Sequence, residues 1–286
     1  MTIDTAIDTW ATEDPVSAEG RQMYDRLWNK GILVQIQGGV WSMEAKLTAK
    51  DIGLDGNEIP EFISLGKKRL LPTAEKNRFH NYVSRARNQA ERLGFPFFIT
   101  GSYFIPFANF DRLKDLLEKE KDGFYDTVDA FIERYDDRRD AFLEANDKFR
   151  EILEVHYPPA GEVRSKFSFQ IIYFMASLSS SVTNDASGEE LYVNWAVQAV
   201  NSLRDEARTA ADAIQTAVTD GTLDGRTMRR VQTLIDRLTN MDLTGDADLR
   251  SAAFAVVSNP STATASALKS AATAVSLDDV RAVVLD

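Results

Sequence analysis

The stretch of sequence that decides the fold is "FYDTVDAFIERYDDRRDAFLEANDKFREI", residues 124–152. Its apolar side chains recur every three or four positions, which is the spacing of one face of an α-helix. From residue 107 to 156 the chain holds no proline and one glycine, Gly123, before Pro158 and Pro159 end the pattern. The sequence therefore predicts one helix over 107–156, which would be roughly 75 Å long.

A helix of this length needs a partner along its apolar face, because propensity alone rarely supports it. Residues 189–219 show the same spacing, with mostly small side chains where the first helix has aromatic ones. Large and small side chains interdigitate well, so we expect the two segments to form an antiparallel helical hairpin. The predicted interaction seam of this hairpin contains Phe124, Phe131, Tyr135, Phe142, Phe149, Leu203 and Ile214.

The rest of the chain is predicted to supply a few strands and several short helices. Three segments rich in aromatic and β-branched residues are expected as strands, at 32–41, 95–107 and 162–181. Shorter helices are expected near 226–241, 246–258 and 262–284. The predicted fold class is mainly α (α+β): a long antiparallel helical hairpin, a small β-sheet at its base and a C-terminal bundle of short helices.

This pattern also predicts how the chain divides into domains. We expect a flexible acidic tail at 1–14, an α+β domain over 15–188 that contains the long helix, and a helical region over 189–286.

The composition excludes several classes of protein. The 286 residues include no cysteine, which excludes disulfides, zinc–thiolate sites and thiol nucleophiles and suits a reducing cytoplasm. The N-terminus lacks a basic segment followed by an apolar run, so it does not predict a secretory signal. The longest apolar run, "FSFQIIYFMASL" (167–178), is too short to span a bilayer. We therefore expect a cytoplasmic protein without a membrane partner.

One short segment is strongly basic although the whole chain carries a net charge of −11. Residues 67–92 hold two Glu and eight basic residues, which are Lys67, Lys68, Arg69, Lys76, Arg78, Arg85, Arg87 and Arg92. Residues 111–154 hold 15 Asp and Glu against nine Lys and Arg, a net −6 that matches the net +6 of the basic segment. These opposite charges favour contact between the two segments, within one chain or between subunits.

The helical pattern over 73–93 bears on what the basic segment does. Lys76, His80 and Arg87 flank one side of its apolar stripe, and Arg78, Arg85 and Arg92 flank the other. A helix that reads a DNA groove would concentrate such groups on its outward face. Side chains that flank a buried stripe suit pairing with neighbouring elements, so we favour a structural role and keep nucleic-acid binding by these eight residues as the alternative.

No catalytic constellation is apparent in the sequence. His80 and His156 are isolated, and neither has a second histidine or carboxylate at a metal-ligand spacing. The glycine pairs and turns lack the pattern of a phosphate-binding loop. We expect no cofactor, no metal and no enzymatic activity.

Several motifs in the first half of the chain resemble a known family. They are "LWNKGILVQIQGGVWSMEAKLTAKDIGL" from residue 27, then "SLGKKRLLP", a basic helix, "GFPFFITGSYFIP" and a long charged helix. This order is similar to an uncharacterised family of bacteria, phages and plasmids, domain-of-unknown-function family 3150. The resemblance implies genes beside a MoxR-like AAA ATPase and a von Willebrand factor A-type protein, and it brings no catalytic residues.

Together these observations predict a non-catalytic scaffold or adaptor. It would associate with itself or bind a protein partner such as an AAA ATPase. A nucleic-acid-binding protein that uses the segment 67–92 is the alternative.

Overall fold

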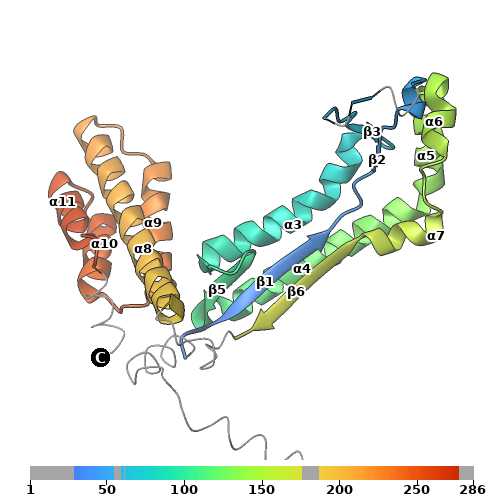
Figure 1. Cartoon of the computed structure of the whole chain (residues 1–286). Helices are drawn as coiled ribbons and strands as arrows, with labels where there is room; N and C mark the ends of the chain where they lie inside the picture. Colours follow the sequence, from blue (N-terminus) through green and yellow to red (C-terminus); the bar gives the residue numbers. More distant parts are fainter. Residues whose placement is uncertain (1–28, 55–58, 61, 176–186, 277–286) are drawn as a thin grey trace, which may run out of the picture. The chain divides into compact units, whose positions relative to one another are not determined.

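The structure is a computed structural model that describes residues 29–54, 59–60, 62–175 and 187–276 (Figure 1). Six strands and nine α-helices lie in this described part. The prediction of a mainly α (α+β) protein with a small sheet is confirmed. The tail 1–14 lies outside the described residues.

The chain divides into two compact units that interleave along the sequence. Unit 1 contains 1–34, 90–112 and 173–286, and unit 2 contains 35–89 and 113–172. The sequence predicted contiguous domains at 15–188 and 189–286, whereas the structure assigns parts of the first half to both units.

The strands form a four-stranded sheet in the order β4-β5-β1-β6 and a separate pair of β2 with β3. Phe95 in β4 lies opposite Phe104 in β5 in an antiparallel pair, and Ala45 in β2 lies opposite Lys68 in β3 in another. The predicted strand 95–107 is thus a hairpin of two strands. The bounds are β1 Gly31–Gly39, β2 Glu44–Lys46, β3 Lys67–Arg69, β4 Phe95–Pro96, β5 Ser102–Pro106 and β6 Ser168–Phe174.

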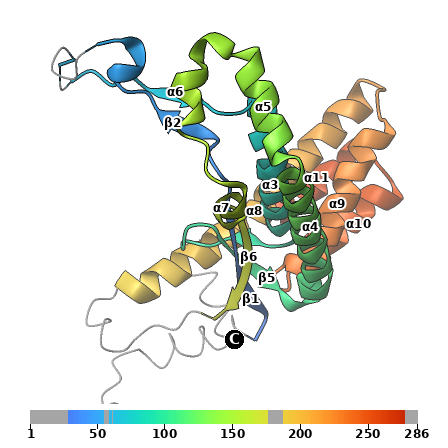
Figure 2. The same ribbon diagram turned by 90° about the vertical axis from the view of Figure 1, so that its right-hand side faces the viewer.

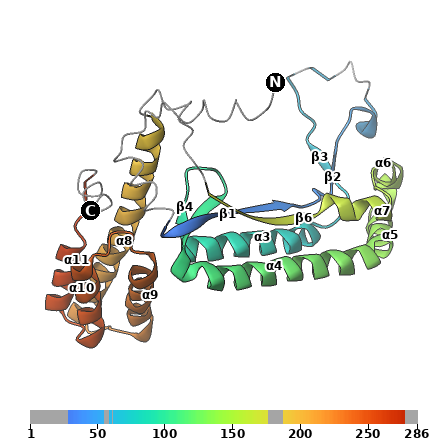
Figure 3. The same cartoon turned by 90° about the horizontal axis from the view of Figure 1, so that it is seen from below.

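Unit 2 packs α3 and α4 along the strands β1 and β6 (Figure 3). Its core is aromatic: the ring of Phe79 in α3 lies 5.5 Å from that of Phe131 in α4 and 4.6 Å from that of Phe167. Phe124 lies 5.5 Å from Phe169 in β6. The helical elements of this region are α3 Thr73–Leu93, α4 Phe107–Glu133, α5 Tyr135–Ala145, α6 Arg150–Glu154, α7 Ala160–Val163, and the short 3-10 turns η2 Lys50–Ile52, η4 Asp147–Phe149 and η5 Arg164–Lys166.

Two glycines allow close packing in unit 2. A Cβ atom on Gly38 in β1 would lie 2.4 Å from a methyl carbon of Val83 in α3, too close for any other residue. A Cβ on Gly123 would lie 2.8 Å from the ring of Tyr82. Gly123, which the sequence showed as the one glycine in a long helix, therefore lets α4 approach α3.

The single helix predicted over 107–156 is wrong, because the chain breaks it twice. Arg134 has φ −111° and ψ 14°, which ends α4 and starts α5. Asn146 has φ −122° and ψ 35°, and its side-chain amide donates a hydrogen bond to the carbonyl of Phe142 at 2.8 Å. The break at Arg134 accompanies the burial of Tyr135, whose hydroxyl donates to the carbonyl of Pro158 at 2.8 Å.

Unit 1 contains a bundle of four helices, which Figure 1 shows side by side: α8 Ser187–Thr219, α9 Gly225–Met241, α10 Ala247–Ser258 and α11 Thr262–Ala271. Each short helix begins at a side-chain cap, provided by Asp224, Asp246 and Ser261. The aromatic ring of Trp195 in α8 also packs 5.2 Å from Phe104, and its indole N–H donates to the carbonyl of Pro96 at 2.7 Å.

The predicted hairpin between 107–156 and 189–219 is wrong in its pairing. The apolar face of α8 is covered by α9 and α11 within unit 1, and the apolar face of α4 is covered by α3 and β6 within unit 2. The buried alanines of α8 share one core with the larger Leu234, Ile235 and Leu238 of α9, so large and small side chains do pack together, but within unit 1. The prediction was wrong in the choice of partner helix, because the aromatic face of α4 packs against other aromatic side chains of unit 2.

Candidate interaction surfaces

The structure distributes the residues of the predicted seam between the two units. Phe124, Phe131 and Tyr135 are buried in unit 2, and Leu203 and Ile214 are buried in the bundle of unit 1. In contrast, Phe142 is half-buried and Phe149 is 57% exposed. Most of these side chains are thus core residues of their own units, whereas the exposed ring of Phe149 is accessible to a binding partner.

The basic segment is held mainly by acids from the connection around β2. Lys68 Nζ lies 2.7 Å from Asp51 Oδ2, and both side chains are largely buried. Asp51 also accepts a hydrogen bond from the backbone N–H of Thr48 at 2.7 Å. The Lys68 ammonium and this N–H hold the pKa of Asp51 far below its usual range.

Glu44 in β2 binds two further lysines of the segment. Its carboxylate oxygens lie 3.2 Å from Lys67 Nζ and 3.3 Å from Lys76 Nζ. Lys67 and, second, Lys76 lower the pKa of Glu44 by hydrogen bonding. The short pairing of β2 with β3 brings these groups together, and no pattern in the sequence indicates that pairing.

Arg85 makes the contact that the sequence predicted with the acidic segment 111–154. Its guanidinium donates to both carboxylate oxygens of Glu120 in α4, with Nε to Oε1 at 3.1 Å and Nη2 to Oε2 at 2.7 Å. The guanidinium also lies 4.4 Å from the ring centre of Tyr82. The hydrogen bonds to Glu120 raise the pKa of Arg85, so this arginine is firmly charged and engaged.

The remaining basic side chains differ in their surroundings. Arg87 donates to the carbonyl of Ile36 at 3.3 Å, and Arg92 is also engaged. Arg78 Nη1 lies 3.4 Å from Glu75 Oε2. The carboxylate of Glu75 also forms an ion pair with Arg138 of α5. Within the described part of the chain, Arg69 is exposed and has no ion pair. Thus most of the charges that a nucleic acid would need already have partners inside the chain.

A groove of about 660 Å³ lies between α3 and α4 in unit 2. Four arginines line it, which are Arg78, Arg85, Arg134 and Arg138. Glu75 and Glu120 form ion pairs with three of them, and the carboxylates of Asp126 and Glu133 also line the groove. The groove offers an anion little charge that is not already compensated.

One end of unit 2 exposes an unusual number of large apolar side chains. We call it the apolar end and define it by Ile52, Leu54, Phe62, Ile63, Phe149 and Val155. Phe62 is 88% exposed and Val155 is 77% exposed. The connection from β2 to β3 and the helices α5 and α6 lie at this same end in two perpendicular views (Figure 1, Figure 2).

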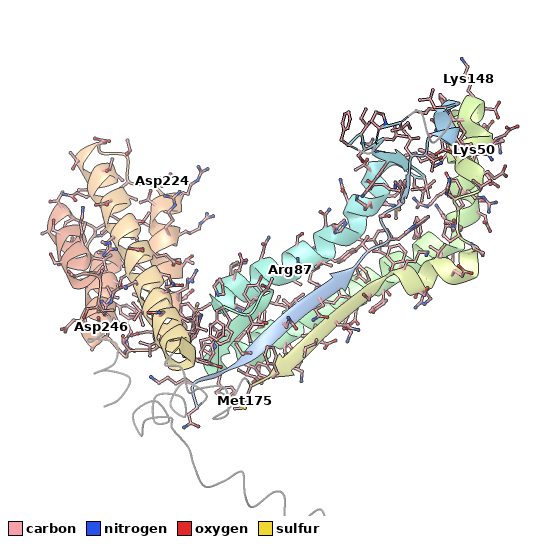
Figure 4. All side chains as sticks on the ribbon, in the orientation of Figure 1. Lys50, Arg87, Lys148, Met175, Asp224 and Asp246 are labelled. Carbon is pink, nitrogen blue, oxygen red and sulfur yellow. The ribbon has the colours of Figure 1, made fainter. Side chains whose placement is uncertain are left out.

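Figure 4 agrees with this placement, because it labels Lys50, beside Ile52, and Lys148, beside Phe149, at that end of unit 2. The sequence of residues 46–72 predicts only a connector with short helical pieces, so this surface was missed. A signal was available: Ile52, Leu54, Phe62 and Ile63 lie in a segment with glycine and proline but without helical or strand periodicity. Apolar residues in such a loop have no core of their own element to join.

The described residues contain no group of three His, Cys, Asp or Glu side chains that could hold a metal ion. His80 is exposed and His156 is half-buried. In the part of the chain that the structure describes, no helix is both long and apolar enough to cross a membrane.

The fold and these surfaces define a mainly α protein of two units whose basic segment is largely ion-paired. Comparison with known families gives one match, over residues 29–250, to the family described as "Protein of unknown function (DUF3150)". The chain belongs to this family, and the match extends well beyond the first half in which the sequence motifs lie. No curated protein and no solved structure matches the chain.

Proposed function

We propose that this protein is a non-catalytic cytoplasmic adaptor that binds a protein partner through the apolar end of unit 2. The observation that carries the proposal is the exposure of Phe62 in the connection from β2 to β3, of Phe149 in η4 and of Val155 after α6, all at one end of the unit. The absence of cysteine supports a reducing compartment.

The cost of leaving these side chains in water argues for a partner. Full burial of one Phe or Val side chain contributes about 1.5–3 kcal/mol, so a partner that covers several of them gains substantial affinity. Large apolar side chains exposed together on a soluble protein commonly mark an interaction site. A side chain that is 88% exposed, as Phe62 is, suits insertion into a pocket of the partner.

The family resemblance suggests which partner to examine first. An AAA ATPase of the MoxR-like kind is implied by that resemblance, and a second copy of the chain is the other protein partner expected from the sequence. Either partner would bury the apolar side chains. Self-association of the purified protein in light scattering would indicate a second copy of the chain, and a monomer would indicate a different protein.

The experiment compares affinity purification with three full-length baits from the native host. One bait is the wild type, one carries Phe62→Ser with Val155→Ser, and the control carries Phe254→Ser, an equally apolar and 52% exposed side chain of unit 1. We expect the double variant to lose its main protein partner at least about tenfold, which is about 1.4 kcal/mol of binding free energy. Its melting temperature should stay unchanged because the removed side chains are exposed.

Equal recovery of the same proteins by all three baits, together with strictly monomeric light scattering, would refute this proposal. Loss of the partner by the Phe254→Ser control alone would move the site to unit 1.

Nucleic-acid binding is a second candidate, favoured by the four arginines along the α3–α4 groove and by the exposed Arg69. The ion pairs of Lys67, Lys68, Lys76 and Arg85 weigh against it, because a phosphate backbone would have to displace carboxylates already in place.

A further inference from the structure

A second surface, in unit 1, has a chemistry that the adaptor proposal does not use. A groove of about 540 Å³ runs between α8 and α9. Buried Ala210 and Leu234 are among the residues that line it, so part of the groove is apolar. Arg226, Arg229 and Arg230 also line it, and all three are exposed.

The carboxylates near this groove are already engaged. Asp205 pairs with Arg208, and Glu206 lies 3.0 Å from Arg237. Asp224 accepts hydrogen bonds from the backbone N–H groups of Arg226 and Thr227, at 3.1 and 2.8 Å, and so caps α9. Figure 4 labels Asp224 at the end of α9 where the arginines lie.

The three arginines have no ion-pair partner among the residues that the structure describes. They fall within five consecutive positions of one helix, so their positive charges repel one another in the absence of an anion. A partly apolar groove with three exposed arginines that form no ion pair in the described part of the chain suits a ligand that is both acidic and apolar. A bare nucleic-acid backbone would leave the apolar part of the groove uncovered.

The N-terminal segment of the chain has this chemistry. Residues 1–14, "MTIDTAIDTWATED", contain Asp4, Asp8, Glu13 and Asp14 and no Lys or Arg. Ile3, Ile7 and Trp10 are spaced by four and three positions, as on one face of a helix. The family match begins at residue 29, so this segment lies outside it.

The point where the segment joins the described chain lies within reach of the groove. Lys30 Nζ donates a hydrogen bond to the carbonyl of Leu243 at 2.5 Å, just beyond the C-terminal end of α9. The helix α9 has 17 residues and is about 25 Å long at 1.5 Å per residue. Residues 15–29 can span up to about 50 Å when extended, twice the distance needed.

We propose that residues 1–14 bind in the α8–α9 groove of their own chain, with Asp4 and Asp8 beside Arg226, Arg229 and Arg230 and with Ile3, Ile7 and Trp10 toward Ala210 and Leu234. The segment carries four carboxylates and no Lys or Arg, which suits a groove that is lined by three exposed arginines. This contact is independent of the apolar end of unit 2, so either proposal can fail without the other.

The test is a distance measurement by double electron–electron resonance on the full chain. The chain has no cysteine, so Thr5→Cys and Gln232→Cys give two unique attachment points for spin labels. Thr5 lies opposite the apolar positions on a helical wheel, and Gln232 is exposed on α9. We expect one narrow, short distance distribution in this protein at moderate ionic strength.

Two charge-reversal variants provide the matched comparison. In the first, Arg226, Arg229 and Arg230 are changed to Glu, and the narrow distribution should broaden to long distances. In the control, the exposed Lys114, Lys119 and Lys148 of unit 2 are changed to Glu, which alters the net charge equally. The control should keep the narrow distribution.

Three results would overturn the proposal. A broad distribution in the unaltered labelled protein would show that the segment does not bind there. A narrow distribution that survives reversal of the three arginines would exclude the groove. A short distance that disappears when labelled protein is diluted with unlabelled protein would show that the segment comes from a second copy.

Discussion

In unit 2 aromatic rings form the centre of the core, whereas in unit 1 the helix α8 presents a row of alanines to its neighbours. Phe79 alone lies within 4.6 to 6.1 Å of the rings of three other phenylalanines. On α8, Ala207 and Ala211 are fully or nearly fully buried. Edge-to-face aromatic pairs and closely approaching small-residue helices are two separate solutions to dense packing.

This difference teaches that the size of the side chains on a helix does not by itself identify the helix it packs against. The aromatic face of α4 packs against other aromatic side chains of unit 2, whereas the alanines of α8 share a core with the larger aliphatic side chains of α9. The predictions that follow test whether the two cores behave as separate and different.

The largest effect is expected from Phe79→Ala in unit 2. Phe79 is fully buried, so the change should cost about 3–5 kcal/mol of unfolding free energy. Two variants that each keep a single tryptophan, either Trp41 in unit 2 or Trp195 in unit 1, report the unfolding of each core in urea by tryptophan fluorescence. Phe79→Ala should lower the urea midpoint of the transition reported by Trp41 more than the midpoint reported by Trp195.

The matched control is Phe149→Ala, because Phe149 is in the same unit and 57% exposed. It should change neither midpoint. Equal shifts of both tryptophan signals in Phe79→Ala would mean that the two cores unfold as one.

A smaller effect is expected from Ala207→Phe in unit 1. Ala207 is fully buried on α8, and overpacking such a site typically costs about 1–3 kcal/mol. The transition reported by Trp195 should move, while Gln215→Phe on the exposed side of the same helix should leave it unchanged. If Ala207→Phe is as stable as the wild type, the bundle is not closely packed at α8.

Asp51→Asn should make the stability of unit 2 less dependent on pH. Because Lys68 lowers the pKa of Asp51, the pair stabilises the fold above the ordinary carboxyl pKa and this stabilisation is lost as the pH falls through the lowered value. Thermal melts between neutral and acid pH should show a larger drop for the wild type than for the variant. Parallel curves would show that the pair does not stabilise the folded state.

The smallest effect on stability is expected when Arg78, Arg85 and Arg92 are all changed to Gln. The exposed pair of Arg85 with Glu120 contributes about 0–1 kcal/mol, so the melting temperature should fall slightly. In a fluorescence-anisotropy titration at about 150 mM salt, where charges are screened beyond about 8 Å, wild type and variant should both bind DNA and RNA weakly. Submicromolar binding by the wild type that is lost in a normally melting variant would favour the nucleic-acid function.

The sequence predicted the existence of most helices because the pattern that identifies them is local. The three short helices of unit 1 begin at or within one residue of their expected positions, where capping side chains such as Asp224 and Ser261 lie. The break at Arg134 left no signal, since the apolar spacing continues through Tyr135 and no glycine or proline lies there.

Partners distant in sequence could not be predicted in the same way. The pairing of Lys68 with Asp51 depends on β2 meeting β3, and three-residue strands carry too few residues for a periodic pattern. Net charge predicted a contact between the segments 67–92 and 111–154. It could not predict that Arg85 and Glu120 are the residues that form this contact. The apolar end was missed because its residues come from a loop and from helix ends that meet only in the folded unit.

The most direct test of the central claim, that the apolar end of unit 2 binds a protein, is site-specific photo-crosslinking. Since the chain has no cysteine, Phe62→Cys and Phe254→Cys can each carry a single benzophenone label in an otherwise unchanged protein. In extracts of the native host, the label at position 62 should crosslink one protein in high yield, and the label at 254 should not. The absence of any crosslink at 62, or the same products at both positions, would contradict the account.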